Sequence, residues 1–130
     1  MHAGIAFVKV LRGRGLINLD GTTGLALDKP DPYVKISTGY CTAQTKVIND
    51  NLNPNWNEML QLNINDVSAP IELEVWDKDC FSKDDSMGRS TISLQGLVPN
   101  EPKTISAPLG IGKGAVDIDE VTWMPLKRLA

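Results

Sequence analysis

Hydrophobic and polar residues alternate along several short stretches of this chain, and a period of two is typical of β-strands that bury one face. The alternation is clearest in Ile71–Trp76, where Ile71, Leu73 and Val75 are predicted to face the core. Glu72 and Glu74 between them are predicted to face solvent. Gly, Pro, Asn or Asp bound each stretch, and almost no segment has a sustained helical period. The pattern predicts eight strands, at Gly4–Leu11, Tyr33–Thr38, Ala43–Ile48, Glu58–Ile64, Ile71–Trp76, Ser90–Leu94, Lys103–Ala107 and Ala115–Trp123.

Eight strands without crossover helices favour an all-β fold built as a two-sheet sandwich over a parallel α/β sheet. In the last expected strand the alternation breaks near Asp119, which predicts a β-bulge there. Asn53-Pro54-Asn55 cannot continue a strand, because proline donates no ladder hydrogen bond. With 130 residues, 42% of them hydrophobic and 22% charged, we expect one domain over residues 1–130.

The charge, cysteine content and hydropathy of the chain exclude some partners and settings. A net charge of −3 provides no basic field to attract nucleic acid. Cys41 and Cys80 fall in separate turns and do not form a disulfide framework, so a reducing, cytosolic setting is the simpler interpretation. No stretch approaches the roughly 20 apolar residues of a membrane span, so any contact with a membrane is expected to be peripheral.

Five aspartates form two clusters at places where an expected strand ends. Loop 1, between the first two expected strands, contains Asp20 and Asp31, and loop 3, between the fifth and sixth, contains Asp77, Asp79 and Asp85. Clustered carboxylates repel one another unless a cation lies among them, and oxygen ligands are those that Ca²⁺ prefers. The clusters therefore predict a calcium site if the fold brings the two loops together. Turn capping explains one aspartate at a time, but not three after one strand.

Other acidic or metal-dependent sites fit the residues less well. An EF-hand loop beginning at Asp77 would need an oxygen ligand at Phe81, a glycine at Ser82 and a glutamate at Gly88. Zinc lacks a ligand set, because the two cysteines are distant and His2 is the sole histidine. Paired carboxylates alone are weak support for a glycosidase, since no nucleophile motif accompanies them.

Four motifs follow one another along the chain: Asp31-Pro32-Tyr33-Val34-Lys35, Thr45-Lys46-Val47-Ile48, Leu52-Asn53-Pro54-Asn55-Trp56-Asn57-Glu58 and the segment Val75–Gly88. They stand in the order and spacing of a C2 domain, and the chain resembles that family over nearly its whole length. The resemblance implies an eight-stranded antiparallel sandwich whose loops at one end bind calcium and phospholipid. Its N- and C-terminal strands look like the circularly permuted type II topology. The details are similar to domains of extended synaptotagmins and tricalbins and to plant C2 proteins.

The resemblance also implies a ligand set for two or more calcium ions. In many members one ligand lies six residues before the Asp of Asp-Pro-Tyr, and here that position is Leu25. Counting forward from Gly15-Leu16 favours Asp20 instead, with a five-residue insertion, while Asp28 remains a competitor. The implied metal-binding residues are Asp20, Asp31, Asp77, Asp79, Ser82 and Asp85, with Asp28 as the alternative in loop 1.

Apolar and basic residues near the loop tips predict contact with a membrane. Phe81 falls at the apex of loop 3 with Lys83 close by, and Leu25 and Leu27 fall in the inserted part of loop 1. Apolar side chains at an exposed tip regain transfer free energy when they enter the headgroup region. An equally good interpretation of Leu25 and Leu27 is that they fold back onto the sandwich.

Some C2 domains also bind phosphoinositides on a sheet face, and Tyr33, Lys35, Lys46 and Trp76 match those positions here. Gln44 stands where a second lysine would be, and ordinary packing explains the two aromatic residues equally well. The function implied by the resemblance is calcium-dependent binding to anionic phospholipid membranes, as a monomeric, non-enzymatic targeting or tethering module at the cytosolic face. The alternative is a calcium-insensitive interaction or structural module.

Overall fold

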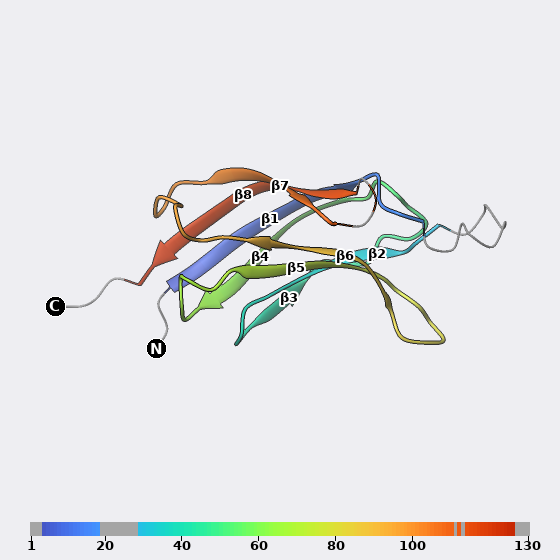
Figure 1. Cartoon of the computed structure of the whole chain (residues 1–130), viewed down its shortest axis with the longest axis horizontal. Coiled ribbons are helices and arrows are strands. Elements are labelled where there is room, and N and C mark those ends of the chain that lie inside the picture. Colours follow the sequence, from blue (N-terminus) through green and yellow to red (C-terminus); the bar gives the residue numbers. More distant parts are fainter. Residues whose placement is uncertain (1–3, 19–28, 111, 113, 127–130) are drawn as a thin grey trace.

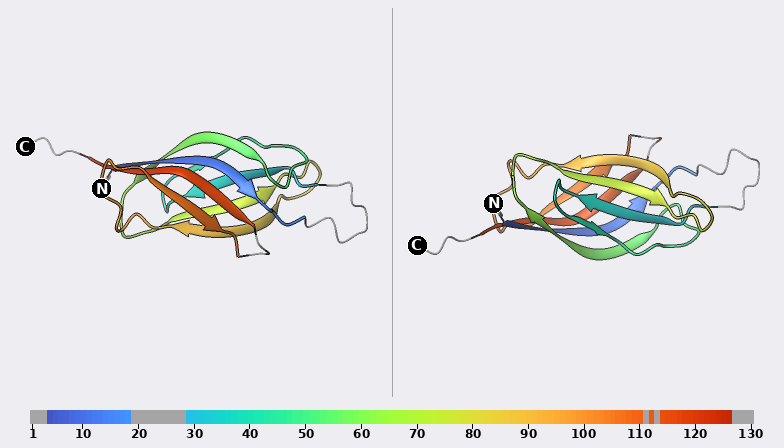
Figure 2. Two further views of the ribbon diagram at one scale, coloured as in Figure 1. Left: turned by 90° about the horizontal axis from the view of Figure 1, so that it is seen from above. Right: turned by 90° about the horizontal axis from the view of Figure 1, so that it is seen from below.

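The computed structural model describes residues 4–18, 29–110, 112 and 114–126. Eight antiparallel strands form two four-stranded sheets packed face to face, as Figures 1 and 2 show from three directions. One sheet has the order β4-β1-β8-β7 and the other β3-β2-β5-β6. The strands are β1 (Gly4–Arg14), β2 (Pro32–Ser37), β3 (Thr42–Gln44), β4 (Asn55–Ile64), β5 (Ile71–Asp77), β6 (Asp85–Ile92), β7 (Lys103–Pro108) and β8 (Ala115–Pro125). The predicted all-β sandwich is confirmed.

The first and last strands lie side by side at the centre of one sheet. β1 pairs with β8 along its whole length, from Gly4 opposite Pro125 to Arg14 opposite Ala115. This pairing is the one expected of the permuted, type II topology. The predicted bulge is also present, because Lys9 pairs with Glu120 and Val10 with Ile118, which leaves Asp119 as the extra residue.

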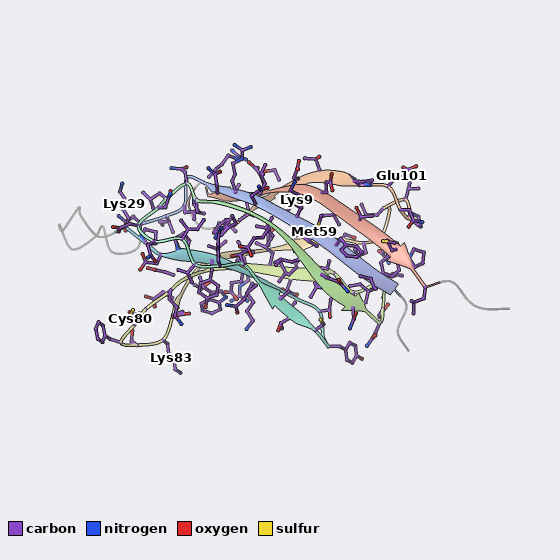
Figure 3. The ribbon with its side chains drawn as sticks, turned by 180° about the vertical axis from the view of Figure 1, so that it is seen from behind. Lys9, Lys29, Met59, Cys80, Lys83 and Glu101 are labelled. Carbon is purple, nitrogen blue, oxygen red and sulfur yellow. The ribbon has the colours of Figure 1, made fainter. Side chains whose placement is uncertain are left out.

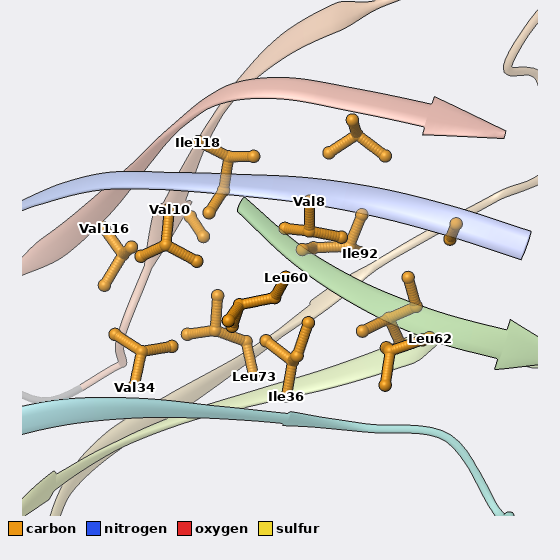
Figure 4. Close-up of a cluster of buried hydrophobic side chains, with 14 of the residues drawn as sticks. Val8, Val10, Val34, Ile36, Leu60, Leu62, Leu73, Ile92, Val116 and Ile118 are labelled. Carbon is orange, nitrogen blue, oxygen red and sulfur yellow. The ribbon is translucent and has the colours of Figure 1, made fainter. Parts of the chain in front are cut away.

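Alternating apolar residues from both sheets fill the space between them (Figure 4). On β5, Ile71, Leu73 and Val75 are fully buried, as their alternation with Glu72 and Glu74 predicts. The same periodicity continues to Asp77, which is 8% exposed and ends the inward-facing row. A carboxylate therefore lies at the edge of the core, at the end of the sandwich where β5 leads into the loop before β6.

Several strand boundaries differ from the predicted ones by one to three residues, and two differ by more. β3 ends at Gln44 and not at Ile48, because the Thr45 hydroxyl accepts the hydrogen bond of the Val34 N–H in place of a ladder carbonyl. β6 begins at Asp85 and not at Ser90, because Asp85 and Ser86 pair with the end of β5.

Gly88 conceals this earlier start in the sequence, since a glycine inside a strand weakens the pattern. Its φ of 116° and the Leu109 backbone oxygen, 2.6 Å from where a Cβ would lie, require glycine at this position.

Candidate metal and membrane site

Three loops meet at the end of the sandwich where β1, β3 and β5 end and β2, β4 and β6 begin (Figure 1). Loop 3 joins β5 to β6, and Figure 3 shows it extending beyond the sheets, with Cys80 and Lys83 toward its far end and Lys29 at the same end of the sandwich. Five aspartates from three segments line one pocket there, together with two lysines and the tip of loop 3. The lining residues are Lys29, Asp31, Asp50, Asp77, Lys78, Asp79, Cys80, Phe81 and Asp85.

The two predicted acidic clusters are thus brought together for the residues that the structure describes. Asp31, at the end of loop 1, donates its N–H to Asp77 Oδ1 at 2.9 Å, and its carbonyl accepts the Lys78 N–H at 3.0 Å. These contacts extend the β2–β5 ladder, in which Pro32 pairs with Asp77, by one residue. Asp20 and Asp28, and with them the choice between these two ligands, lie outside the described residues.

Asp77 and Asp85 lie directly opposite each other on β5 and β6. Side chains of directly opposed residues in an antiparallel pair project from the same face of the sheet. Two carboxylates in this arrangement destabilise the pair through like-charge repulsion. A cation between them would convert that repulsion into shared coordination.

Asp79 lies in loop 3, where its carboxylate organises the turn around itself. Its Oδ1 accepts the Phe81 N–H at 2.9 Å, and its Oδ2 accepts the Ser82 hydroxyl at 2.8 Å. These hydrogen bonds lower the pKa of Asp79 below its ordinary value, and the one from the Phe81 backbone contributes most. The carboxylate is therefore ionised throughout the physiological pH range, as a calcium ligand needs to be. Ser82, the predicted auxiliary oxygen donor, has its Oγ at the same turn.

Asp50 is an acidic residue of the pocket that the sequence pattern did not single out. It belongs to loop 2, between β3 and β4, and its N–H donates to Asp31 Oδ1 at 2.8 Å. Its φ of 58° lies in the left-handed region, which Asp tolerates better than most residues. The run Asn49-Asp50-Asn51 indicates a turn, but nothing in its spacing links it to the other aspartates.

The donor set fits a hard cation, because every acidic side chain of the pocket offers carboxylate oxygens. Within the described ranges, however, no group of three or more His, Cys, Asp or Glu side chains is arranged to hold a metal ion. Several of the oxygens instead accept hydrogen bonds from neighbouring N–H groups. The pocket thus has the chemistry of a calcium site without a closed ligand set.

At the tip of the same loop, Phe81 is 99% exposed, and Lys83 beside it is also exposed. Exposure of a phenyl ring to water is unfavourable, and the ring would regain transfer free energy if an apolar phase covered it. The position agrees with the predicted apex of loop 3. Leu25 and Leu27, the other two predicted membrane contacts, lie outside the described residues.

The predicted phosphoinositide residues are only partly brought together. Tyr33, Lys35 and Trp76 line one groove on the outer face of the β3-β2-β5-β6 sheet, with Gln44, Lys83 and Asp84. Lys46 is not among the lining residues; its backbone N–H donates to Glu58 Oε2 at 2.8 Å.

Inside the groove the Tyr33 hydroxyl donates a hydrogen bond to Asp84 Oδ2. Burial of the phenol, and then this carboxylate, raise the pKa of Tyr33 to about 12. Asp84, which the sequence pattern did not select, therefore places a negative charge in the groove.

Comparison with known proteins identifies the family. The family model for the C2 domain matches residues 4–109. This chain belongs to the C2 domain family. The Arabidopsis thaliana protein C2-DOMAIN ABA-RELATED 11 is 43% identical over 95 residues, which are 73% of this chain and 54% of that protein. This C2 domain spans about half the length of several curated relatives and about a fifth of others.

Solved structures of C2 domains have the same fold as this chain. A single C2 domain of plant extended synaptotagmin 1 superposes with a TM-score of 0.81 at 28% identity, covering 98% of this chain and 99% of that one. The calcium-bound pair of C2 domains of extended synaptotagmin 2 gives a TM-score of 0.75 at 26% identity, covering 95% of this chain and 46% of that one. Both resemblances inferred from the sequence, to extended synaptotagmins and to plant C2 proteins, are confirmed. Among the described residues no helix is long and apolar enough to cross a membrane.

Proposed function

We propose that this C2 domain binds anionic phospholipid membranes in a calcium-dependent manner and acts as a targeting or tethering module and not as an enzyme. One observation supports this more than any other. Carboxylates from three loops line a single pocket, and a fully exposed phenylalanine lies at its edge. Gathering like charges in one pocket and leaving a phenyl ring in water are both unfavourable for the sandwich, although individual carboxylates also accept hydrogen bonds from loop N–H groups.

The calcium ligands that we propose are Asp31, Asp77, Asp79 and Asp85, with Ser82 as an auxiliary donor and Asp20 or Asp28 from loop 1. Calcium, when bound, supplies positive charge and coordination positions that lipid phosphates can occupy. In its absence the carboxylates give the loop end a negative potential that repels anionic lipid. Two or more ions would offset most of that charge, which couples calcium affinity to membrane affinity by linkage.

Phe81 and Lys83 are the membrane contacts that we propose at loop 3, with Leu25 and Leu27 at loop 1. Burial of the Phe81 ring supplies apolar free energy, while the ammonium group of Lys83 meets anionic headgroups. The free thiols of Cys41 and Cys80 are compatible with the cytosolic face of a membrane.

Two further candidates each have an observation in their favour. A phosphoinositide headgroup fits the sheet-face groove through Lys35 and Lys83, although Asp84 in the same groove opposes it. A calcium-insensitive interaction module is favoured by the lack of a closed set of three ligands among the described residues.

Liposome cosedimentation over a calcium titration separates these functions. We expect the wild type to bind vesicles of phosphatidylserine and phosphatidylcholine only with calcium, and Asp77→Asn/Asp79→Asn to lose that response. Asp66→Asn is the matched control, because Asp66 also caps a turn, from the opposite end of the sandwich. Binding that survives excess chelator would contradict the proposal and favour the calcium-insensitive module.

Calorimetry on Asp20→Asn and Asp28→Asn distinguishes the two candidate ligands of loop 1. The variant of the true ligand should bind calcium more weakly, whereas the other should match the wild type. Unaltered binding by Asp20→Asn would remove Asp20 from the site.

A further inference from the structure

Asp84 connects loop 3 to the body of the sandwich. Its Oδ1 accepts the N–H of Asp79 at 2.9 Å, and its Oδ2 accepts the hydroxyl proton of Tyr33 on β2. One carboxylate thus joins the backbone of a candidate calcium ligand to a strand that is 51 residues away in the sequence. The Asp84 side chain is only 18% exposed, so these bonds are partly shielded from competing water.

The two partners of Asp84 differ in how firmly the fold holds them. Tyr33 is 9% exposed and lies in β2, which pairs with β3 on one side and β5 on the other. Asp79 lies in a loop that projects beyond the sheets (Figure 3). A hydrogen bond from a packed strand to a projecting loop restricts the loop far more than the strand.

The contacts around Asp79 extend this restriction to the loop tip. The Asp79 carboxylate accepts hydrogen bonds from the Phe81 N–H and from Ser82 Oγ. The chain of contacts therefore runs from Tyr33 through Asp84 and Asp79 to Phe81. Lys78 Nζ, 3.9 Å from Asp84 Oδ2 and half exposed, adds little, because exposed ion pairs are weak.

We propose that Asp84 is a positioning residue: it holds loop 3 against Tyr33 so that Asp79 and Phe81 are presented in place before any ligand binds. Asp84 itself is not among the residues that line the aspartate pocket. Its effect on calcium affinity is therefore indirect, through the entropy that loop 3 no longer loses on binding. The expected effect of Asp84 on calcium binding rests on the proposed function, whereas the expected effect of Asp84 on the metal-free loop does not.

Two substitutions separate positioning from charge. Asp84→Asn removes the charge, but its amide oxygen still accepts the Asp79 N–H and its NH₂ group donates to the Tyr33 oxygen. Asp84→Ala removes both hydrogen bonds. If Asp84 acts by position, only the alanine variant is impaired; if it acts by charge or as a ligand, both are.

Calorimetry without lipid and amide hydrogen exchange of the metal-free protein provide the test. We expect Asp84→Ala to weaken calcium binding about tenfold and to speed exchange of the Asp79 amide about tenfold, the scale expected for the loss of partly shielded hydrogen bonds to a charged group. Asp84→Asn should stay within about threefold of the wild type in both. Tyr33→Phe should have an intermediate effect, and Asp84→Ala/Tyr33→Phe should be no worse than Asp84→Ala alone, because the two act through one contact.

Asp66→Ala is the control, since it also removes a turn-capping aspartate but at the opposite end. Equal losses in Asp84→Asn and Asp84→Ala, or no loss in Asp84→Ala, would overturn the positioning role. A wild type that binds no calcium would refute the proposed function. The exchange rates of the same variants would then decide the role of Asp84 by themselves.

Discussion

The two ends of this sandwich use aspartate in opposite ways. At one end, the turn between β4 and β5 is capped by Asp66, whose Oδ1 accepts the N–H and the hydroxyl of Ser68 two residues away. At the other end, Asp31, Asp77 and Asp84 bond to partners 19, 46 and 51 residues distant. Local capping needs one carboxylate, whereas the loop end gathers five around a pocket.

This difference separates a structural role from the functional role that we propose. Asp66 satisfies the turn in which it lies, which is an ordinary use of aspartate. At the loop end, Asp77 and Asp85 are paired like charges and the Phe81 ring is exposed to water. Selection for stability alone would disfavour both features. Predictions that alter one end and leave the other unchanged therefore test the comparison.

Among single substitutions that compare the two ends, the largest effect is expected from Phe81→Ala on membrane binding. Full transfer of a phenyl ring from water is worth about 1.5–3 kcal/mol, so partial insertion corresponds to roughly tenfold in vesicle affinity. Because the side chain is 99% exposed, the free energy of unfolding should change by less than about 0.5 kcal/mol. Cosedimentation with calcium and urea unfolding in chelator measure the two quantities.

Tyr40→Ala is the matched control for this substitution, because Tyr40 is an aromatic residue that is 78% exposed and connects β2 to β3 at the other end. It should leave vesicle binding unchanged. A Phe81→Ala variant that also loses calcium binding in the absence of lipid would indicate a disrupted loop and would contradict the role as a membrane contact.

A smaller effect, of opposite sign at the two ends, is expected from neutralising single aspartates. Asp85→Asn relieves the like-charge pair with Asp77 and should stabilise the metal-free protein by roughly 0.5 kcal/mol. Asp66→Asn weakens a charge-assisted cap and should destabilise it slightly. Urea unfolding in chelator at low ionic strength measures both, and the gain from Asp85→Asn should shrink at high salt. A destabilising Asp85→Asn would mean that the carboxylates do not repel each other.

Much of the fold could be predicted from the sequence because burial enforces a period of two. The inward row of β5 and the bulge at Asp119 both follow from alternation. The early start of β6 could not be predicted from alternation, because it depends on pairing with β5 and because Gly88 interrupts the local pattern.

The candidate site was predictable where spacing within one segment identifies residues, as for Asp77, Asp79 and Asp85. It was not predictable where the fold alone brings residues together. Asp50 reaches the pocket from loop 2, and Asp84 matters because its side chain bonds to Tyr33. Neither contact leaves a signal in the sequence near the residue concerned.

The smallest effect concerns pH, where both ends should behave alike until calcium is added. Hydrogen bonds lower the pKa of Asp66 and of Asp79, from Ser68 at one end and from Phe81 and Ser82 at the other. A lowered folded-state pKa adds stability that is fully present above the unfolded value of about 3.9 and is lost as pH falls through the folded value. In chelator, NMR titration should therefore place both groups below about pH 3.9. Calcium should lower the apparent pKa of Asp79 further and leave Asp66 unchanged, because only at the loop end does a cation compete with the proton. Equal responses of the two aspartates to calcium would remove the distinction between the two ends.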